Sequence, residues 1–248
     1  MSIPISAPFG EFLGTALLIL LGNGVVANVV LKGTKGNQSG WMVITAGWAF
    51  AVTMGIYLVN SVSGAHLNPA VTLGLAVIGK LEWASVGLYV LGQLLGAFFG
   101  AWLVWVCYYS HWELTQDPDA KRAVFCTAPA VRNPLANFFC EIIATFVLVL
   151  GVLAISSPKN LIPDSGFAQG FGPVLVGLLV WSIGLSLGGP TGFAINPARD
   201  LAPRLFHSLF PISGKGGSDW GYAWIPVFGP IIGGILGAIV YAALWPSP

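Results

Sequence analysis

One stretch of eight residues occurs twice in related form, as Ser63-Gly-Ala-His-Leu-Asn-Pro-Ala70 and as Thr191-Gly-Phe-Ala-Ile-Asn-Pro-Ala198. Asparagine is among the best N-cap residues, and proline is tolerated in the first helical turn because its missing N–H would have no partner there. We therefore predict that Asn68 and Asn196 each begin a helix. The apolar sequence after each proline lasts about 10 residues, which makes a helix of about 15 Å, half the thickness of a bilayer core. The two stretches that contain these predicted half-helices are Gly64–Gly79 and Gly188–Phe206.

The repetition extends beyond these two stretches. Glu11-Phe-Leu-Gly-Thr15 recurs as Glu141-Ile-Ile-Ala-Thr145, and the distance from the glutamate to the asparagine of the later motif is 57 positions in the first copy and 55 in the second. The chain therefore contains two repeats, at approximately 8–109 and 138–246, within a single transmembrane domain that covers 1–248. Each repeat holds three full spans, so the second enters the bilayer from the opposite side, as in transporters built from inverted repeats.

The composition indicates a membrane protein with several spans. Only 8% of the residues are charged, against about 25% in soluble domains, and 56% are hydrophobic. Six uncharged or nearly uncharged segments are long enough to cross a bilayer, and the first lacks the basic flank of a cleaved signal. These predicted spans are Phe9–Leu31, Trp41–Val62, Trp83–Tyr109, Phe138–Ser156, Phe167–Leu187 and Tyr222–Trp245. We expect an all-α protein with six transmembrane helices and two re-entrant half-helices.

The same composition excludes several partners. A net charge of +1 provides no basic face for nucleic acid. The three cysteines, Cys107, Cys126 and Cys140, lack metal-ligand spacing and are expected to be free thiols. No cofactor and no metal are predicted.

Two half-helices from opposite faces would meet through their N-termini. That meeting point presents two positive dipole ends and two asparagine amides, beside unwound backbone that offers carbonyl groups. It would repel cations and hydronium and still pass a neutral, hydrogen-bonding solute.

On these motifs the chain resembles the aquaporin family and, within it, the bacterial glycerol facilitators. The likeness extends from Glu11-Phe-Leu-Gly-Thr15 to Gly229-Pro-Ile-Ile-Gly233. It implies one pore in each subunit, usually a homotetramer, in the cell membrane with both termini cytoplasmic. It places the pore centre at Asn68, Pro69, Ala70, Asn196, Pro197 and Ala198, and the pore-lining backbone at Gly64, Ala65, His66, Leu67, Ala194 and Ile195.

The resemblance also implies a narrow outer constriction formed by Trp48, Gly184, Phe193 and Arg199. Trp48 and Phe193 would form an apolar corner for a carbon chain, Arg199 would bind hydroxyl groups, and Gly184 would leave volume open. This set suits a small polyol such as glycerol. A water-selective member is the alternative, and we expect it to carry a larger residue, commonly histidine, in place of Gly184.

Two buried acids, Glu11 and Glu141, occupy equivalent places, and the resemblance implies that they hold the re-entrant backbone from behind. Asp200 and Arg204 have i, i+4 spacing and also resemble the glycerol branch. The imidazole of His66 is expected to pack structurally, with a pH gate as the alternative. Ser110–Asn133 is expected to be a solvated wall of the outer vestibule.

Other function classes have weaker support. A coupled transporter would need more ionisable groups within the membrane, and an enzyme would need a catalytic constellation, which the three histidines do not form. Water, urea, dihydroxyacetone and protonated lactic acid remain possible solutes. The orientation implied by the family conflicts with the usual excess of cytoplasmic Lys and Arg, since it places only Lys80 and Lys159 inside.

Overall fold

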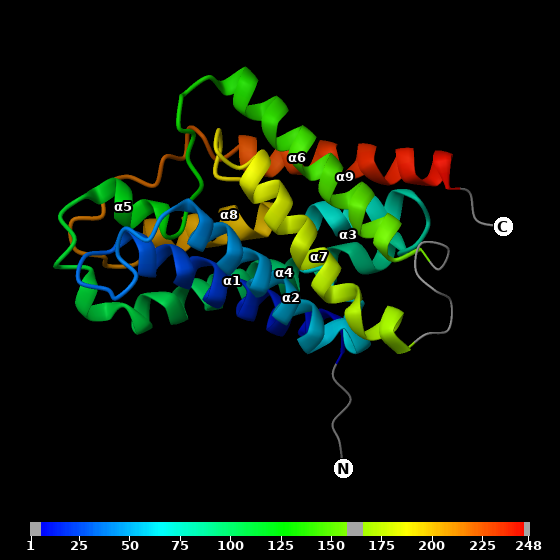
Figure 1. Ribbon diagram of the computed structural model, residues 1–248, viewed down its shortest axis with the longest axis horizontal. Helices are drawn as coiled ribbons and strands as arrows, with labels where there is room; N and C mark the ends of the chain where they lie inside the picture. Colours follow the sequence, from blue (N-terminus) through cyan, green and yellow to red (C-terminus); the bar gives the residue numbers. More distant parts are fainter. Residues whose placement is uncertain (1–5, 158–165, 246–248) are drawn as a thin grey trace, which may run out of the picture.

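The computed structural model describes residues 6–157 and 166–245, and in these ranges the chain is helical without strands (Figure 1). The elements are α1 (Ala7–Val30), α2 (Trp41–Ser63), α3 (Pro69–Val77), α4 (Trp83–Cys107), η1 (Tyr109–His111), α5 (Pro118–Ala123), α6 (Pro134–Ile155), α7 (Gly166–Ser186), α8 (Pro197–Leu209) and α9 (Ile225–Leu244). Figure 1 shows the start of α1 and the end of α9 away from α5, which lies at the other end of the long axis.

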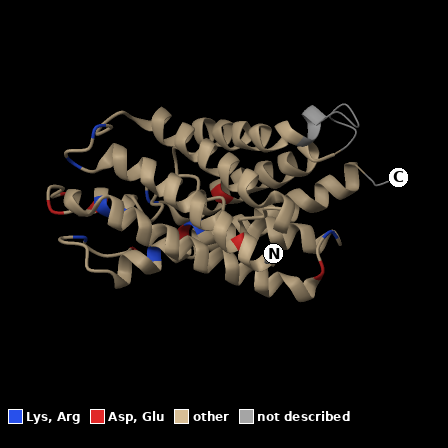
Figure 2. Cartoon of the chain, turned by 90° about the horizontal axis from the view of Figure 1, so that it is seen from below, with Lys and Arg blue, Asp and Glu red and all other residues tan. Residues whose placement is uncertain are grey.

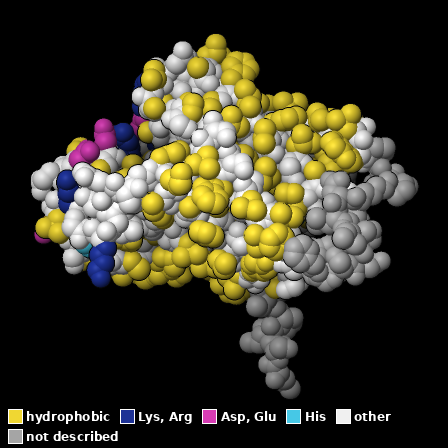
Figure 3. Space-filling model, in the orientation of Figure 1, with side chains coloured by type: hydrophobic (Ala, Val, Ile, Leu, Met, Phe, Trp, Pro, Cys, Tyr) yellow, Lys and Arg dark blue, Asp and Glu magenta, His cyan; other side chains and the backbone are white. Residues whose placement is uncertain are grey.

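Five helices, α1, α2, α4, α6 and α9, are long and apolar enough to cross a membrane. The remaining predicted span, Phe167–Leu187, corresponds to α7, in which Gly170–Ser186 forms a shorter apolar segment. Charged residues lie mainly toward the end of the bundle that holds α5, with fewer in the middle and at the opposite end (Figure 2). Hydrophobic side chains cover much of the middle of the face seen in Figure 3. The chain is therefore a multi-pass membrane protein.

The helix bounds differ from the predicted spans by a few residues. Helix α6 begins at Pro134, four residues before the predicted start, because Asn133 caps it through the Ala136 amide. Helix α4 ends at Cys107, and α9 begins at Ile225 rather than at Tyr222. Lys159, expected on the cytoplasmic side, lies outside the described residues.

Glycines bring equivalent helices of the two repeats together. Helix α1 packs against α4, and α6 packs against α9. A Cβ atom on Gly96 would collide with the Phe12 carbonyl, and one on Gly233 would collide with the Ile142 carbonyl. Backbone contact at these positions requires glycine, as in other small-residue helix interfaces.

The predicted half-helices are present as α3 and α8, capped by Asn68 and Asn196. Their nine and 13 residues correspond to about 14 and 20 Å, too short to cross a membrane. Helix α3 packs mainly on α9, and α8 packs mainly on α4. Each half-helix therefore lies against the last helix of the other repeat.

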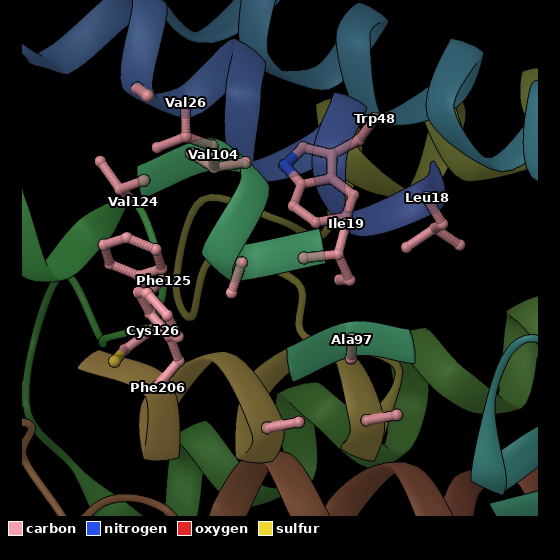
Figure 4. Packing of buried hydrophobic residues seen from close by; sticks show 14 of the residues in the cluster. Leu18, Ile19, Val26, Trp48, Ala97, Val104, Val124, Phe125, Cys126 and Phe206 are labelled. Carbon is pink, nitrogen blue, oxygen red and sulfur yellow. The ribbon is translucent and has the colours of Figure 1, made fainter. Parts of the chain in front are cut away.

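Part of Ser110–Asn133 is exposed, as expected of a solvated loop, whereas another part of it is buried. This segment contains η1 and α5, and Val124, Phe125 and Cys126 are buried in the main apolar cluster beside Phe206 (Figure 4). The rings of Phe125 and Phe206 lie 5.4 Å apart. Burial of these three apolar side chains is favourable because it removes apolar surface from water.

Candidate functional site

The two re-entrant loops are joined at their tips by a pair of crossed hydrogen bonds. The Asn68 side chain accepts from the Ala70 amide at 2.8 Å and donates to the Ile195 carbonyl at 2.8 Å. Asn196 likewise caps α8 and donates to the Leu67 carbonyl at 2.8 Å. Each amide group therefore holds its own helix and the opposite loop, with one N–H left over.

The remaining residues of the two motifs pack around this contact. Pro69 and Pro197 occupy the first helical position, where no backbone donor is needed. Ala70 and Ala198 are fully buried, and a Cβ atom on Gly234 of α9 would lie 2.7 Å from the Ala70 carbonyl oxygen. Small side chains at these positions let the half-helices approach their neighbours.

The loop before each half-helix alternates between left-handed and other backbone conformations. Positive φ values occur at Gly64, Ala65, Leu67, Gly192, Phe193 and Ile195. A left-handed conformation costs a non-glycine residue about 1 to 3 kcal/mol, and most for a β-branched residue such as Ile195. Such alternation gathers successive N–H groups into a concave anion site.

In the first loop that site holds the carboxylate of Glu11, which is fully buried. Glu11 accepts hydrogen bonds from the amides of His66 at 2.9 Å and Leu67 at 2.6 Å. The Ser63 hydroxyl and the Gln93 side-chain amide donate to it at 2.6 and 2.7 Å. These contacts offset the cost of burying the charge and fix the strained backbone.

The second loop holds Glu141 in the same way. Its two carboxylate oxygens accept from the amides of Ala194 and Ile195, both at 2.9 Å. The amides of each loop are therefore bound to a carboxylate, and the Leu67 and Ile195 carbonyls accept from the asparagine of the opposite loop.

The two loops line a cavity of about 500 Å³. Asn60, Ser156 and Ser157 line one part of it, and Trp48, Phe193 and Arg199 line another. Of the predicted site residues, the lining includes Trp48, Gly64, Ala65, His66, Leu67, Asn68, Phe193, Ala194, Ile195, Asn196 and Arg199. As far as the described residues define it, the lining does not include Gly184 or the Pro-Ala pairs of the two motifs.

The three lining residues predicted for the constriction contact one another or lie close by. The Arg199 guanidinium lies 4.1 Å from the centre of the Trp48 ring, a cation–π contact. Trp48 and Phe193 are each 3% exposed, and Arg199 is 6% exposed. Within residues 6–157 and 166–245, Arg199 forms no ion pair and the Trp48 indole N–H has no hydrogen-bond partner. Hydrogen-bond donors and apolar rings therefore meet at one point of the cavity.

A buried ion pair lies on α8, directly after Arg199 in the sequence. Arg204 donates to Asp200 at 2.7 Å, and both side chains are fully buried. Asp200 also accepts from the amide and hydroxyl of Thr127, and Arg204 donates to the Ser218 carbonyl at 2.6 Å. The pair therefore joins α8 to two loops, a role that its i, i+4 spacing did not indicate.

Sequence reasoning missed Thr127, Gln93 and Trp41 as part of this region. Gln93 donates to both Glu11 and Thr72, so it connects the buried acid to α3. Trp41 donates to the Gly184 carbonyl at 3.1 Å. The only sequence signal for Thr127 was the apolar triplet before it in an otherwise polar segment.

Comparisons with known proteins give a consistent assignment. The model of the Major intrinsic protein family matches residues 4–241. A probable glycerol uptake facilitator protein of Thermotoga maritima is 61% identical over 91% of this chain and 93% of its own length. A D/L-lactic acid transporter of Lactiplantibacillus plantarum is 42% identical over 86% of each chain. The structure of the aquaglyceroporin from Plasmodium falciparum is 32% identical and superposes with a TM-score of 0.83, covering 95% of this chain and 94% of the other. With its half-helices, crossed asparagines and lined cavity, the chain belongs to the major intrinsic protein family.

Proposed function

We propose that this protein is a passive channel for glycerol and other small neutral solutes, which excludes ions and protons. The observation that carries the proposal is a single cavity lined by both asparagines, by carbonyl-bearing loops and by Arg199 beside Trp48 and Phe193. Aromatic surface suits the carbon side of a polyol, and the guanidinium and amide donors suit its hydroxyl oxygens. The names of the glycerol uptake facilitators among its relatives point the same way.

Ion exclusion follows from charge. Helices α3 and α8 direct their N-termini, with their partial positive charge, at the crossing point of the loops. Arg199 adds a full positive charge in the same cavity. A cation on this path is repelled at two places, whereas an uncharged solute is not. The asparagine amides, positioned by their crossed hydrogen bonds, donate to the passing oxygen.

Several finer points belong to the same proposal. Trp48, Gly184, Phe193 and Arg199 form the selectivity filter. Glu11 and Glu141 support the loops. The two repeats are inverted within one domain, the channel is a homotetramer in the cell membrane with both termini cytoplasmic, and the protein has no enzymatic activity.

The test is stopped-flow light scattering on proteoliposomes, with a matched pair of variants on α7. Val180 lines the cavity, whereas Leu178 is 46% exposed on another face of the same helix. Val180→Trp should abolish glycerol flux, and Leu178→Trp should leave it at the wild-type rate. Equal glycerol flux in wild type and Val180→Trp would show that the solute does not use this cavity.

The same assay separates the alternatives. Water flux without glycerol flux identifies a water-selective aquaporin, and accumulation against a gradient identifies a coupled transporter. Lactic acid is measured at several pH values, because the relative from Lactiplantibacillus plantarum is named for it. A channel for neutral solutes should pass lactic acid faster as the pH falls, since the protonated fraction increases.

A further inference from the structure

The proposed filter residue Gly184 faces another filter residue, Phe193, rather than the cavity. A Cβ atom on Gly184 would lie 3.2 Å from Cζ of Phe193 and 3.0 Å from Cγ2 of Thr45. Both distances are shorter than ordinary van der Waals contact, so the space left by the missing side chain is already filled. Gly184 therefore provides room for the Phe193 ring, and the ring provides the wall of the cavity.

A residue outside the cavity holds both of these positions. Trp41, at the start of α2, donates from its indole nitrogen to the Gly184 carbonyl at 3.1 Å. Its ring meets the Phe193 ring edge to face, with centroids 5.6 Å apart and an interplanar angle of 85°. This is the favoured geometry for two aromatic rings, and it constrains the direction in which Phe193 points.

The backbone at Gly188 also packs closely against the Phe193 and Trp41 rings. A Cβ atom on Gly188 would lie 2.6 Å from Cδ1 of Phe193 and 3.0 Å from Cζ2 of Trp41. Phe193 has a positive φ of 39°, a backbone conformation that a phenylalanine rarely adopts, so contacts with its neighbours must hold it there. Its ring is therefore enclosed by Gly184, Gly188 and Trp41 on the side away from the solute.

We propose that Trp41 is a positioning residue for the selectivity filter, which sets the orientation of Phe193 and thereby the width available to a three-carbon solute. The proposal rests on the proposed glycerol channel function. The side chain of Trp41 is 40% exposed, as a tryptophan at a membrane–water interface would be, and that position alone would not require contact with the filter. The joint contact with Gly184 and Phe193 distinguishes it from an ordinary interfacial anchor.

Replacing Trp41 should change the ratio of glycerol to water permeability rather than the amount of folded channel. Without Trp41, space opens behind the Phe193 ring, so the ring can move away from the solute, and glycerol loses the apolar wall that favours it over water. An aromatic pair contributes enough beyond its buried area to change the glycerol-to-water permeability ratio by about 3- to 10-fold. Trp41→Leu should lower the ratio by that factor. Trp41→Phe retains a ring and loses the hydrogen bond to Gly184, so it should lower the ratio by a smaller factor.

A double-mutant cycle tests whether Trp41 acts through Phe193. Glycerol and water permeabilities are measured in proteoliposomes for wild type, Trp41→Leu, Phe193→Leu and the double variant, normalised to folded protein. Trp83→Leu is the control, since Trp83 begins α4 with 61% of its surface exposed. We expect the ratio to fall in Trp41→Leu, to stay at the wild-type value in Trp83→Leu, and to be the same in Phe193→Leu with or without Trp41.

An unchanged ratio in Trp41→Leu overturns the proposal, and so does an equal further fall when Trp41→Leu is added to Phe193→Leu. If Trp41→Leu does not fold, the same cycle with Trp41→Phe decides by the same criteria. Failure of the channel function itself has a different signature, because wild type would then carry no glycerol flux at all.

Discussion

Replacing either buried glutamate by alanine should destabilise the protein through the loop amides that lose their acceptor. Glu141→Ala leaves the Ala194 and Ile195 amides buried without a partner, and Glu11→Ala does the same to His66 and Leu67. An unsatisfied buried donor costs about 1 to 3 kcal/mol, so each variant should lose about 2 to 6 kcal/mol. This loss would be a large fraction of a typical unfolding free energy, which is about 5 to 15 kcal/mol.

The two variants should differ in a definite order. Glu11 also accepts from Ser63 and Gln93, so its removal disrupts a larger network than the loss of Glu141 does. We expect Glu11→Ala to have the lower melting temperature, and each glutamine variant, which keeps one acceptor oxygen, to lie between alanine and wild type. Glu82→Ala is the control, because Glu82 is exposed and makes no side-chain capping bond.

The measurement is the fraction of folded protein after heating in detergent, followed by solute flux for the folded fraction. In each alanine variant, we expect a lower melting temperature together with a lower glycerol flux. A Glu141→Ala protein with the wild-type melting temperature and no glycerol flux would refute the reasoning, since the carboxylate would then act on the solute and not on the loop.

Three other predictions follow from the geometry. Gly184→His should displace Phe193 and suppress glycerol flux more than water flux in stopped-flow assays; unchanged glycerol flux in a folded variant would contradict the assignment of this position. Solute flux under a membrane potential should carry no current, and a current that increases with protein content would refute ion exclusion. Burial raises the pKa of the Cys126 thiol to about 12, so at pH 8 a maleimide should label exposed Cys107 first, and equal labelling by mass spectrometry would contradict that burial.

The elements that local chemistry determines could be predicted from the sequence. Asn68 and Asn196 cap their own helices through side chains, so the motif alone indicates where α3 and α8 begin. Gly96 and Gly233 recur at equivalent places because each faces a backbone carbonyl of a neighbouring helix. Both features depend on local backbone geometry, which requires a particular residue type at a particular position, so the residue type itself predicts them.

The contacts behind the filter could not be predicted in the same way. Trp41 and Gly184 are 143 positions apart, and Thr127 and Asp200 are 73 apart. Neither pair belongs to one motif. In the sequence, Trp41 lies at the end of a predicted span, as an ordinary interfacial tryptophan does. Their roles depend on how the loops fold back on the helices, which requires three-dimensional information.

The exchange of half-helices between the repeats has a consequence for biogenesis. The partner of α3 is α9, and at Gly74 the two helices approach so closely that a Cβ atom would lie 3.0 Å from the Gly234 carbonyl oxygen. Helix α9 follows α3 in the sequence, after α4, α6, α7 and α8, so α3 is synthesised before the helix that it packs on. Until the second repeat has been synthesised, the Leu67 carbonyl also lacks its Asn196 donor. A chain truncated before residue 225 should therefore leave α3 without the helix that it contacts most.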